Sequence, residues 1–257
     1  MKFKIYELGR MNMPFTIQIV NEFFDTSLEK VLNNIIKEMD NKLLEIEEKF
    51  SPFISTSYVN NHVNIGEQFE NILLDREYQS VYIESVLAKK ETKNLFDPYY
   101  SGSYNPTGLV KGWAIELIFN KYLTPLLDLG VVEACAINGA GDIKVKTKEQ
   151  STFEWNIGIE NPLATNEIIA SYKIKNGCIA TSGFSKRGKH TKVKGNNIQT
   201  TVLTDNLITS EIYATVLLVG NKDENKVLID EKKLTAIIIN ETIEIYEKGK
   251  YIYAQKS

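Results

Sequence analysis

Apolar residues recur along the first half of the chain at the spacing of amphipathic helices. Between residues 26 and 50 they return every three or four positions, which predicts one long helix that ends near Ser51. Thr26 and Glu29 have the spacing of a capping box at its start. The same kind of periodicity predicts two further helices, and an alternating run predicts a strand ahead of them. These helices cover residues 75–90 and about 111–122, and the strand covers residues 15–19.

The pattern changes after residue 132, where short apolar or alternating runs are separated by turns rich in Gly, Asn or Lys. Such runs predict strands, and the last two, on either side of residues 247–250, predict a hairpin. An apolar stretch over about 209–220 has helical spacing and ends on a glycine. The predicted strands are residues 133–138, 142–147, 153–159, 167–174, 178–183, 201–203, 235–240, 243–246 and 251–254.

This order of elements predicts an α+β fold with a mixed, largely antiparallel sheet and packed helices. The chain of 257 residues has no internal repeat and no linker, so we expect a single domain over residues 1–257. Apolar residues make up 43% and charged residues 25%, which is the composition of a globular protein. The net charge of −3, with both signs interspersed, gives no basis for binding nucleic acid.

Several features predict a cytoplasmic protein without a membrane anchor. No apolar run approaches the roughly 20 residues of a membrane helix. The first fifteen residues lack the apolar core of a signal peptide and a cysteine for lipid attachment. Cys135 and Cys178 lie in apolar runs, and we expect two buried thiols rather than a disulfide.

Two glycine-bearing segments could carry chemistry. Gly108 and Gly112 flank Lys111 near a predicted helix start, where backbone N–H groups and a cation can face an anion. The other reading is a glycine-rich turn with a solvated lysine. Between two predicted strands, Asn138 and Asp142 surround small residues that would let a ligand approach the backbone. That segment is also typical of a tight hairpin turn.

Two further segments combine hydroxyl groups with charge. Thr181-Ser182-Gly183 leaves a strand and is followed by basic residues up to His190, a combination that suits phosphate, although a solvated basic loop is an equal alternative. Glu211 and Thr215 share one face of a predicted helix and could hold Mg²⁺. The alternative is an exposed glutamate favoured by the helix dipole and a threonine bonded to the preceding turn. Two histidines and two scattered cysteines do not make a zinc site, and GxSxG, Walker and GxGxxG motifs are absent.

Taken in order, these segments resemble the ApbE family, the FAD:protein FMN transferases. Residues 180–183 are identical to the family's A-T-S-G, and residues 155–162 read W-N-I-G-I-E-N-P beside the family's W-x-V-G-I-E-x-P. The resemblance spans roughly residues 11 to 220. The other matching segments are Met11, residues 50–53, Ser57, Asn60, and residues 96–98, 108–114, 138–143 and 211–215.

The resemblance implies an ApbE-like, T-fold-related architecture and a Mg²⁺-dependent transfer of FMN from FAD to a threonine of an acceptor flavoprotein, with release of AMP. It implies that Lys111 and His190 are the catalytic candidates. The metal ligands implied are the carbonyl of Val110, Glu211 and Thr215, and we expect the Glu211 carboxylate to be exposed. The residues implied to contact FAD are Met11, Lys111, Asn138, Asp142, Thr181, Ser182 and Gly183.

The chain departs from the family pattern at one loop and at single positions, among them Asn105, which replaces an acid, and Thr107, which replaces a glycine. Family members carry H-x-I-D-P-x-T-G after A-T-S-G, whereas no Asp-Pro pair follows His190 here. Glu211 also stands where the family has an aspartate. Two alternatives to the transferase therefore stay open, namely a degenerate non-catalytic FAD-binding protein and a Mg²⁺-dependent FAD pyrophosphatase.

Overall fold

The computed structural model describes residues 1–61, 72, 74–183 and 195–256, and it has the predicted α+β fold. Its strands are β1 (Lys2–Arg10), β2 (Met13–Asn21), β3 (Ala134–Gly139), β4 (Asp142–Thr147), β5 (Trp155–Asn161), β6 (Ala164–Ile174), β7 (Gly177–Gly183), β8 (Gln199–Thr204), β9 (Thr235–Ile239), β10 (Thr242–Glu247) and β11 (Lys250–Lys256). Its helices are α1 (Thr26–Phe50), α2 (Tyr58–Asn61), α4 (Arg76–Glu91), α5 (Thr107–Ile118), the π-helical turn η1 (Phe119–Leu123), α6 (Thr124–Asp128), α8 (Leu207–Val219) and α9 (Lys222–Lys232).

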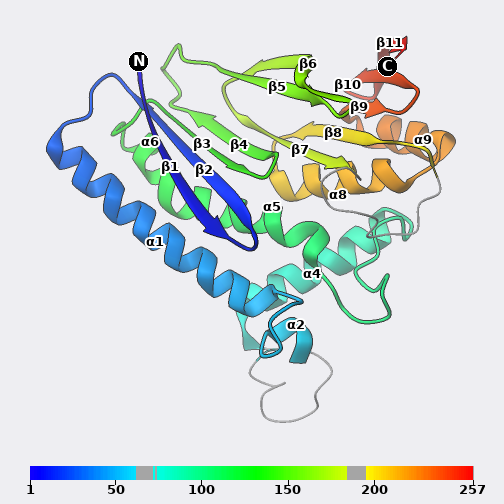
Figure 1. Ribbon diagram of the computed structural model, residues 1–257, viewed down its shortest axis with the longest axis horizontal. Helices are drawn as coiled ribbons and strands as arrows, with labels where there is room; N and C mark the ends of the chain where they lie inside the picture. Colours follow the sequence, from blue (N-terminus) through cyan, green and yellow to red (C-terminus); the bar gives the residue numbers. More distant parts are fainter. Residues whose placement is uncertain (62–71, 73, 184–194, 257) are drawn as a thin grey trace.

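Nine strands form one sheet in the order β1-β2-β3-β4-β7-β8-β9-β10-β11, and each neighbouring pair is antiparallel. β5 and β6 pair only with each other and form a second, two-stranded sheet. Helices α1, α5 and α8 lie on one face of the large sheet, and β5–β6 lies over the opposite face (Figure 1). The large sheet is therefore covered on both faces.

Each face of the large sheet has its own apolar core. In β3, Cys135 and Ile137 join the core under the helices, whereas Ala134 and Ala136 join the core under β5–β6. A strand covered on both sides loses the apolar–polar alternation, which explains the continuous apolar run in β3. Both cysteines are buried free thiols, as predicted. None of the helices in the described ranges is long and apolar enough to cross a membrane.

The first 25 residues differ from the prediction. β1 pairs with β2 along its whole length, so the chain opens with a hairpin that the sequence pattern did not indicate. The residues at its turn, Met11 and Asn12, both have positive φ (54° and 57°). The N-cap of α1 is Asp25, whose carboxylate accepts the N–H of Leu28, and Thr26 is already the first helical residue. An aspartate at this place serves the exposed N–H groups as well as the predicted threonine would.

The helix that carries Lys111 also begins earlier than expected. α5 starts at Thr107, with the Thr107 N–H bound to the side chain of Asn105, so Lys111 lies in the second helical turn. In that turn the Gly112 N–H faces a carboxylate of the chain itself, that of Glu211. Binding of a phosphate by the backbone around Lys111 stays a prediction. α9, which follows α8 after Asn221, was not predicted.

Candidate functional site

Charged side chains are seldom buried, and in the described residues only five are: Lys111, Glu116, Asp142, Glu211 and Glu244. The first four lie where α5 and α8 meet the strands β4 and β7. Burying a charge is costly unless it is paired and hydrogen-bonded. A concentration of such groups at one place is typical of a functional site.

Lys111 joins the two carboxylates of this group. Its Nζ lies 2.5 Å from Oδ2 of Asp142 and 3.9 Å from Oε1 of Glu211. All three residues are nearly enclosed, with exposed fractions of 4% for Lys111, 1% for Asp142 and 3% for Glu211. Sequence reasoning placed these residues at one site, and the structure brings them into contact. The prediction that Glu211 is exposed is wrong, because α8 turns this face against α5.

The close approach of α5 and α8 depends on Gly112. Its N–H donates to Oε2 of Glu211 over 2.6 Å. A Cβ at this position would lie 2.7 Å from the same oxygen and 3.1 Å from the carbonyl oxygen of Leu207. A side chain of any kind would therefore push the two helices apart.

Hydroxyl groups lie beside the charged cluster at the end of β7. Thr181 donates its N–H to Oδ1 of Asp142 over 3.2 Å, and its hydroxyl lies 2.9 Å from that of Thr201. The Ser182 hydroxyl is 3.2 Å from that of Thr215 on α8. The segment Thr181–Gly183 and Thr215 are half-buried, so they form the accessible part of the site.

Asn138 and Met11 occupy turns near the ends of strands. Asn138 Oδ1 accepts the N–H of Gly141 and so closes the β3–β4 hairpin, in which Ala140 and Gly141 have positive φ. This is the turn role that the sequence left open. Met11 lies in the β1–β2 turn and packs against the core under the helices. Contact of either residue with FAD stays a prediction, and His190 lies outside the described residues.

The donor atoms suit Mg²⁺ that arrives with a phosphate ligand. Mg²⁺ prefers oxygen ligands and is commonly held by one or two carboxylates together with substrate phosphates and water. Glu211 and Thr215 supply a carboxylate and a hydroxyl on one helix face, and Asp142 contacts the same lysine as Glu211 does. No group of three or more His, Cys, Asp or Glu in the described ranges could hold a metal unaided. The carbonyl of Val110 lies within α5, where its regular partner is the N–H of Ala114, so its role as a ligand stays a prediction.

Two surface pockets are lined by residues other than Lys111, Asp142 and Glu211. One, of about 360 Å³, is lined by residues that include Asn120, Lys144 and Asp205, and the other, of about 380 Å³, by residues that include Lys222 and Tyr251. Neither is lined by the lysine and carboxylates of the cluster, which agrees with the burial of those side chains.

Glu116, on the same helix as Lys111, is not among the residues that the sequence predicts for the site. It is buried, and it accepts from Lys144 Nζ over 2.8 Å and from the N–H of Leu207 over 2.7 Å. No local pattern points to Glu116, because its partner Leu207 lies 91 residues further along the chain.

Comparison with known proteins gives consistent results. The model of a family described as the ApbE family matches residues 104–238, slightly more than half of the chain. This span contains all four buried charged residues at the α5–α8 contact. No curated protein matches the sequence.

Several solved structures have the same fold. A mutant of the flavin transferase ApbE from Vibrio cholerae superposes with a TM-score of 0.73 at 16% identity, covering 96% of this chain and 98% of that one. An ApbE protein from Thermotoga maritima gives a TM-score of 0.73 at 16% identity, with 100% and 97% covered. The apo form of the flavinyl transferase ApbE from Pseudomonas stutzeri gives 0.69 at 13% identity, with 100% and 94% covered. At such identities the likeness establishes the fold.

Proposed function

This chain belongs to the ApbE family, and on that premise we propose that it transfers FMN from FAD to a threonine of an acceptor flavoprotein. The observation that carries the proposal is the buried cluster of Lys111, Asp142 and Glu211, which lies within the segment that matches the family. The structural relatives named as flavin transferases support the same reading. A cytoplasmic location is part of the proposal.

In the proposed reaction the threonine hydroxyl oxygen of the acceptor forms a bond to the phosphorus of the FMN half. The bond from that phosphorus to the AMP half breaks, AMP leaves with the electron pair, and the hydroxyl proton is released. The groups on the enzyme therefore have to hold a pyrophosphate and offset its negative charge. His190 remains the second catalytic candidate.

The roles of the residues follow from their positions. Lys111 supplies the positive charge, and Asp142 orients its ammonium group through the 2.5 Å contact. The half-buried turn Thr181–Gly183 offers hydroxyl and N–H groups to phosphate oxygens. Glu211 and Thr215, with the carbonyl of Val110, would hold Mg²⁺, which when bound offsets charge on the pyrophosphate. FAD would further contact Met11 and Asn138.

The direct test is incubation of the purified protein with FAD, Mg²⁺ and an acceptor domain that another ApbE enzyme modifies. We expect covalent flavin fluorescence on the acceptor and an equal amount of AMP. Lys111→Met should lower the rates of acceptor labelling and of AMP release by about 100-fold or more, since it removes a charge that acts on the transferring group. Lys146→Met is the matched control, because this lysine pairs with Asp128 outside the cluster. Absence of both products, while the other enzyme forms them in parallel, would disprove the transferase.

A second candidate is a non-catalytic FAD-binding protein. The absent Asp-Pro loop favours it, whereas the retained Lys111, Asp142 and Thr215 oppose it. It predicts that FAD stays bound through dialysis while no AMP is released with any acceptor. A third outcome, release of FMN and AMP without an acceptor, would identify a Mg²⁺-dependent FAD pyrophosphatase.

A further inference from the structure

Two glutamates bind α5 and α8 together in a reciprocal way. Glu211 on α8 accepts the backbone N–H of Gly112 on α5 (2.6 Å), and Glu116 on α5 accepts the backbone N–H of Leu207 on α8 (2.7 Å). A step of four residues forward on α5 corresponds to four residues back on α8, so the helices run in opposite directions at this contact. We call this pair of bonds the α5–α8 clasp.

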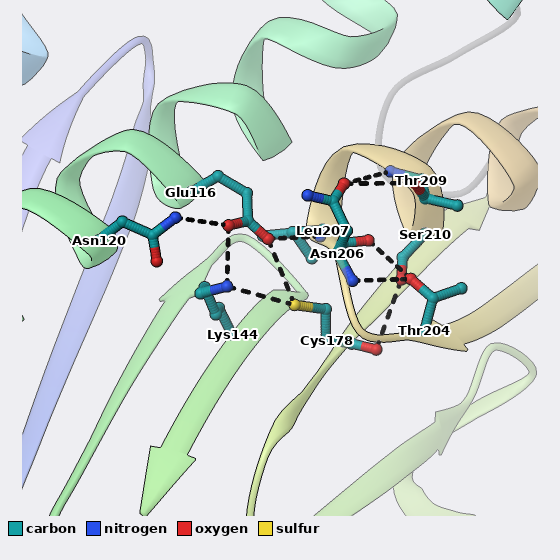
Figure 2. A network of polar contacts seen from close by, with 9 residues as sticks. All are labelled: Glu116, Asn120, Lys144, Cys178, Thr204, Asn206, Leu207, Thr209 and Ser210. Atoms are coloured by element: carbon teal, nitrogen blue, oxygen red, sulfur yellow. Dashed lines mark hydrogen bonds and ion pairs between the residues drawn. The ribbon is translucent and has the colours of Figure 1, made fainter. Parts of the chain in front are cut away.

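Glu116 makes more contacts than the bond in the clasp. Figure 2 shows its carboxylate between α5, β4, β7 and the start of α8. Oε1 accepts from the Leu207 N–H and, over 3.6 Å, from the Cys178 thiol, while Oε2 accepts from Lys144 (2.8 Å) and Asn120 (3.1 Å). A carboxylate offers about four acceptor positions, so this one is fully used.

The surroundings keep these contacts in place. Burial, reinforced by the neighbouring Glu116 carboxylate, raises the pKa of the Cys178 thiol, so the thiol keeps its proton and can donate. Leu207 is the first residue of α8, where the helix leaves N–H groups without helical partners and the dipole favours a negative charge. Glu116 therefore fixes the beginning of the helix that carries Glu211 and Thr215.

We propose that Glu116 is a positioning residue of the site, which sets the place of Glu211 and Thr215 without touching FAD itself. This inference rests on the proposed function for its role in binding FAD and Mg²⁺, whereas its structural part does not. Each element that Glu116 contacts also carries a site residue. Lys111 lies on α5, Asp142 on β4, Thr181 on β7, and Glu211 on α8.

The structural part is tested by the amide resonance of Gly112 in isotope-labelled protein. A short, charge-assisted N–H···O⁻ bond moves this proton resonance downfield. We expect Glu116→Gln to shift it upfield and to speed its exchange with solvent. Glu133→Gln is the matched control, because Glu133 also pairs with a lysine, Lys148, but contacts neither helix of the clasp. An unchanged Gly112 resonance in Glu116→Gln overturns the proposal.

The functional part is tested by FAD titration with and without Mg²⁺, at a temperature where circular dichroism shows every variant folded. Mutation of a residue that orients a metal ligand commonly lowers metal affinity by about 10-fold or more. We expect Glu116→Gln to lower the affinity for FAD in the presence of Mg²⁺ by about 10-fold. The affinity without Mg²⁺ should change much less. A lower melting temperature with unchanged affinities would make Glu116 merely structural and overturn the proposal.

The two tests separate the inference from the proposed function. If the unmodified protein binds no FAD, the proposed function fails, and the Gly112 resonance alone decides whether Glu116 places Glu211. Should Glu116→Gln not fold, Lys144→Met replaces it, because this change leaves the carboxylate but removes its cation. It should move the Gly112 resonance in the same direction, and no movement overturns the proposal.

Discussion

Glu211 shows how burial changes what one side chain does. An exposed carboxylate near a helix start contributes only through the helix dipole, by about 0.3–1 kcal/mol. Glu211 is instead 3% exposed, accepts the Gly112 N–H and lies beside Lys111. Its removal would leave a buried N–H without this acceptor, so it affects stability as well as any metal bound there.

We therefore expect Glu211→Ala to lower the free energy of unfolding by about 1–3 kcal/mol, the range for breaking a buried hydrogen bond to a charged group. Urea unfolding measures this change. Glu48→Ala, an exposed glutamate on α1, should stay within about 0.5 kcal/mol. Equal midpoints for the two variants would contradict the buried bond. Activity of Glu211→Ala has to be compared at a temperature where it is folded.

At the scale of single residues, the sequence indicated which residues belong to the site but not which of them contact one another. Lys111, Asp142 and Glu211 were predicted to share a site through the order of family-like segments, and they are in contact. That Lys111 would be held by Asp142 depends on how β4 lies beside α5, which no local pattern encodes. Glu116 was missed because one glutamate within an apolar helix looks like an isolated polar residue.

At the scale of elements, the packing of α5 against α8 predicts that replacing a helical glycine by alanine destabilises the protein, the opposite of the usual effect. Alanine is favoured over glycine inside a helix by about 1 kcal/mol. At Gly112, however, a Cβ would meet Glu211 at 2.7 Å and the Leu207 carbonyl at 3.1 Å. We expect Gly112→Ala to destabilise the protein by about 1–3 kcal/mol, as overpacking does.

Thermal or urea unfolding of Gly112→Ala decides the sign. Gly9→Ala serves as the control, because a Cβ there meets nothing within 4 Å. A higher midpoint for Gly112→Ala than for the unmodified protein would mean that α5 and α8 are not in close contact at this glycine.

The elements that the sequence pattern missed have irregular polarity. In β1, Phe3 and Ile5 lie on one face but Tyr6 and Leu8 on the other, so the alternation changes face halfway along the strand. In α9 only a short apolar run is buried, and the remaining residues are mostly charged. Its capping box at Asn221 was the available signal. The long, regular helices α1, α4 and α8 were predicted to within a few residues.

At the scale of the whole molecule, we expect the free energy of unfolding to fall at acidic pH. Burial alone would raise the pKa of Asp75 and of Glu77. Hydrogen bonds and charge from Lys49, together with backbone N–H groups, outweigh burial at Asp75 and lower its pKa. Lys42 and Lys49 lower the pKa of Glu77 in the same way. Such carboxylates stabilise the folded state above their unfolded pKa, and this contribution is lost as pH falls through the lower folded values. We expect unfolding free energy to be steady near neutrality and to fall below about pH 4.

Urea unfolding at a series of pH values tests this dependence. Lys49→Met should be less stable than the unmodified protein at neutral pH and should approach it in acid, since it removes the one cation that pairs with both carboxylates and leaves only Lys42 at Glu77. Lys30→Met, at an exposed position of α1, should follow the unmodified protein throughout. If the free energy of unfolding of Lys49→Met stayed below that of the unmodified protein by the same amount at every pH, Asp75 and Glu77 would not be the source of the acid sensitivity.

The fold class was predictable because strand and helix periods differ and the turn residues are clear. The layered arrangement was not. Residues 153–174 read as two more strands in the series, whereas β5 and β6 leave the large sheet and cover its second face. Which face a strand covers depends on long-range packing of Trp155 and Ile157 with β3 and β9, not on its own pattern. A single domain over residues 1–257 stays a prediction.

The large sheet ends on one side at β1 and on the other at β11, and these outer strands have consequences for association. An outer strand presents unpaired N–H and C=O groups that can recruit another chain and start an aggregate. β11 also exposes apolar side chains, which would encourage this. Basic side chains oppose it, because copies meeting along these strands would bring cations together. They are Lys2 on β1 and Lys250 on β11.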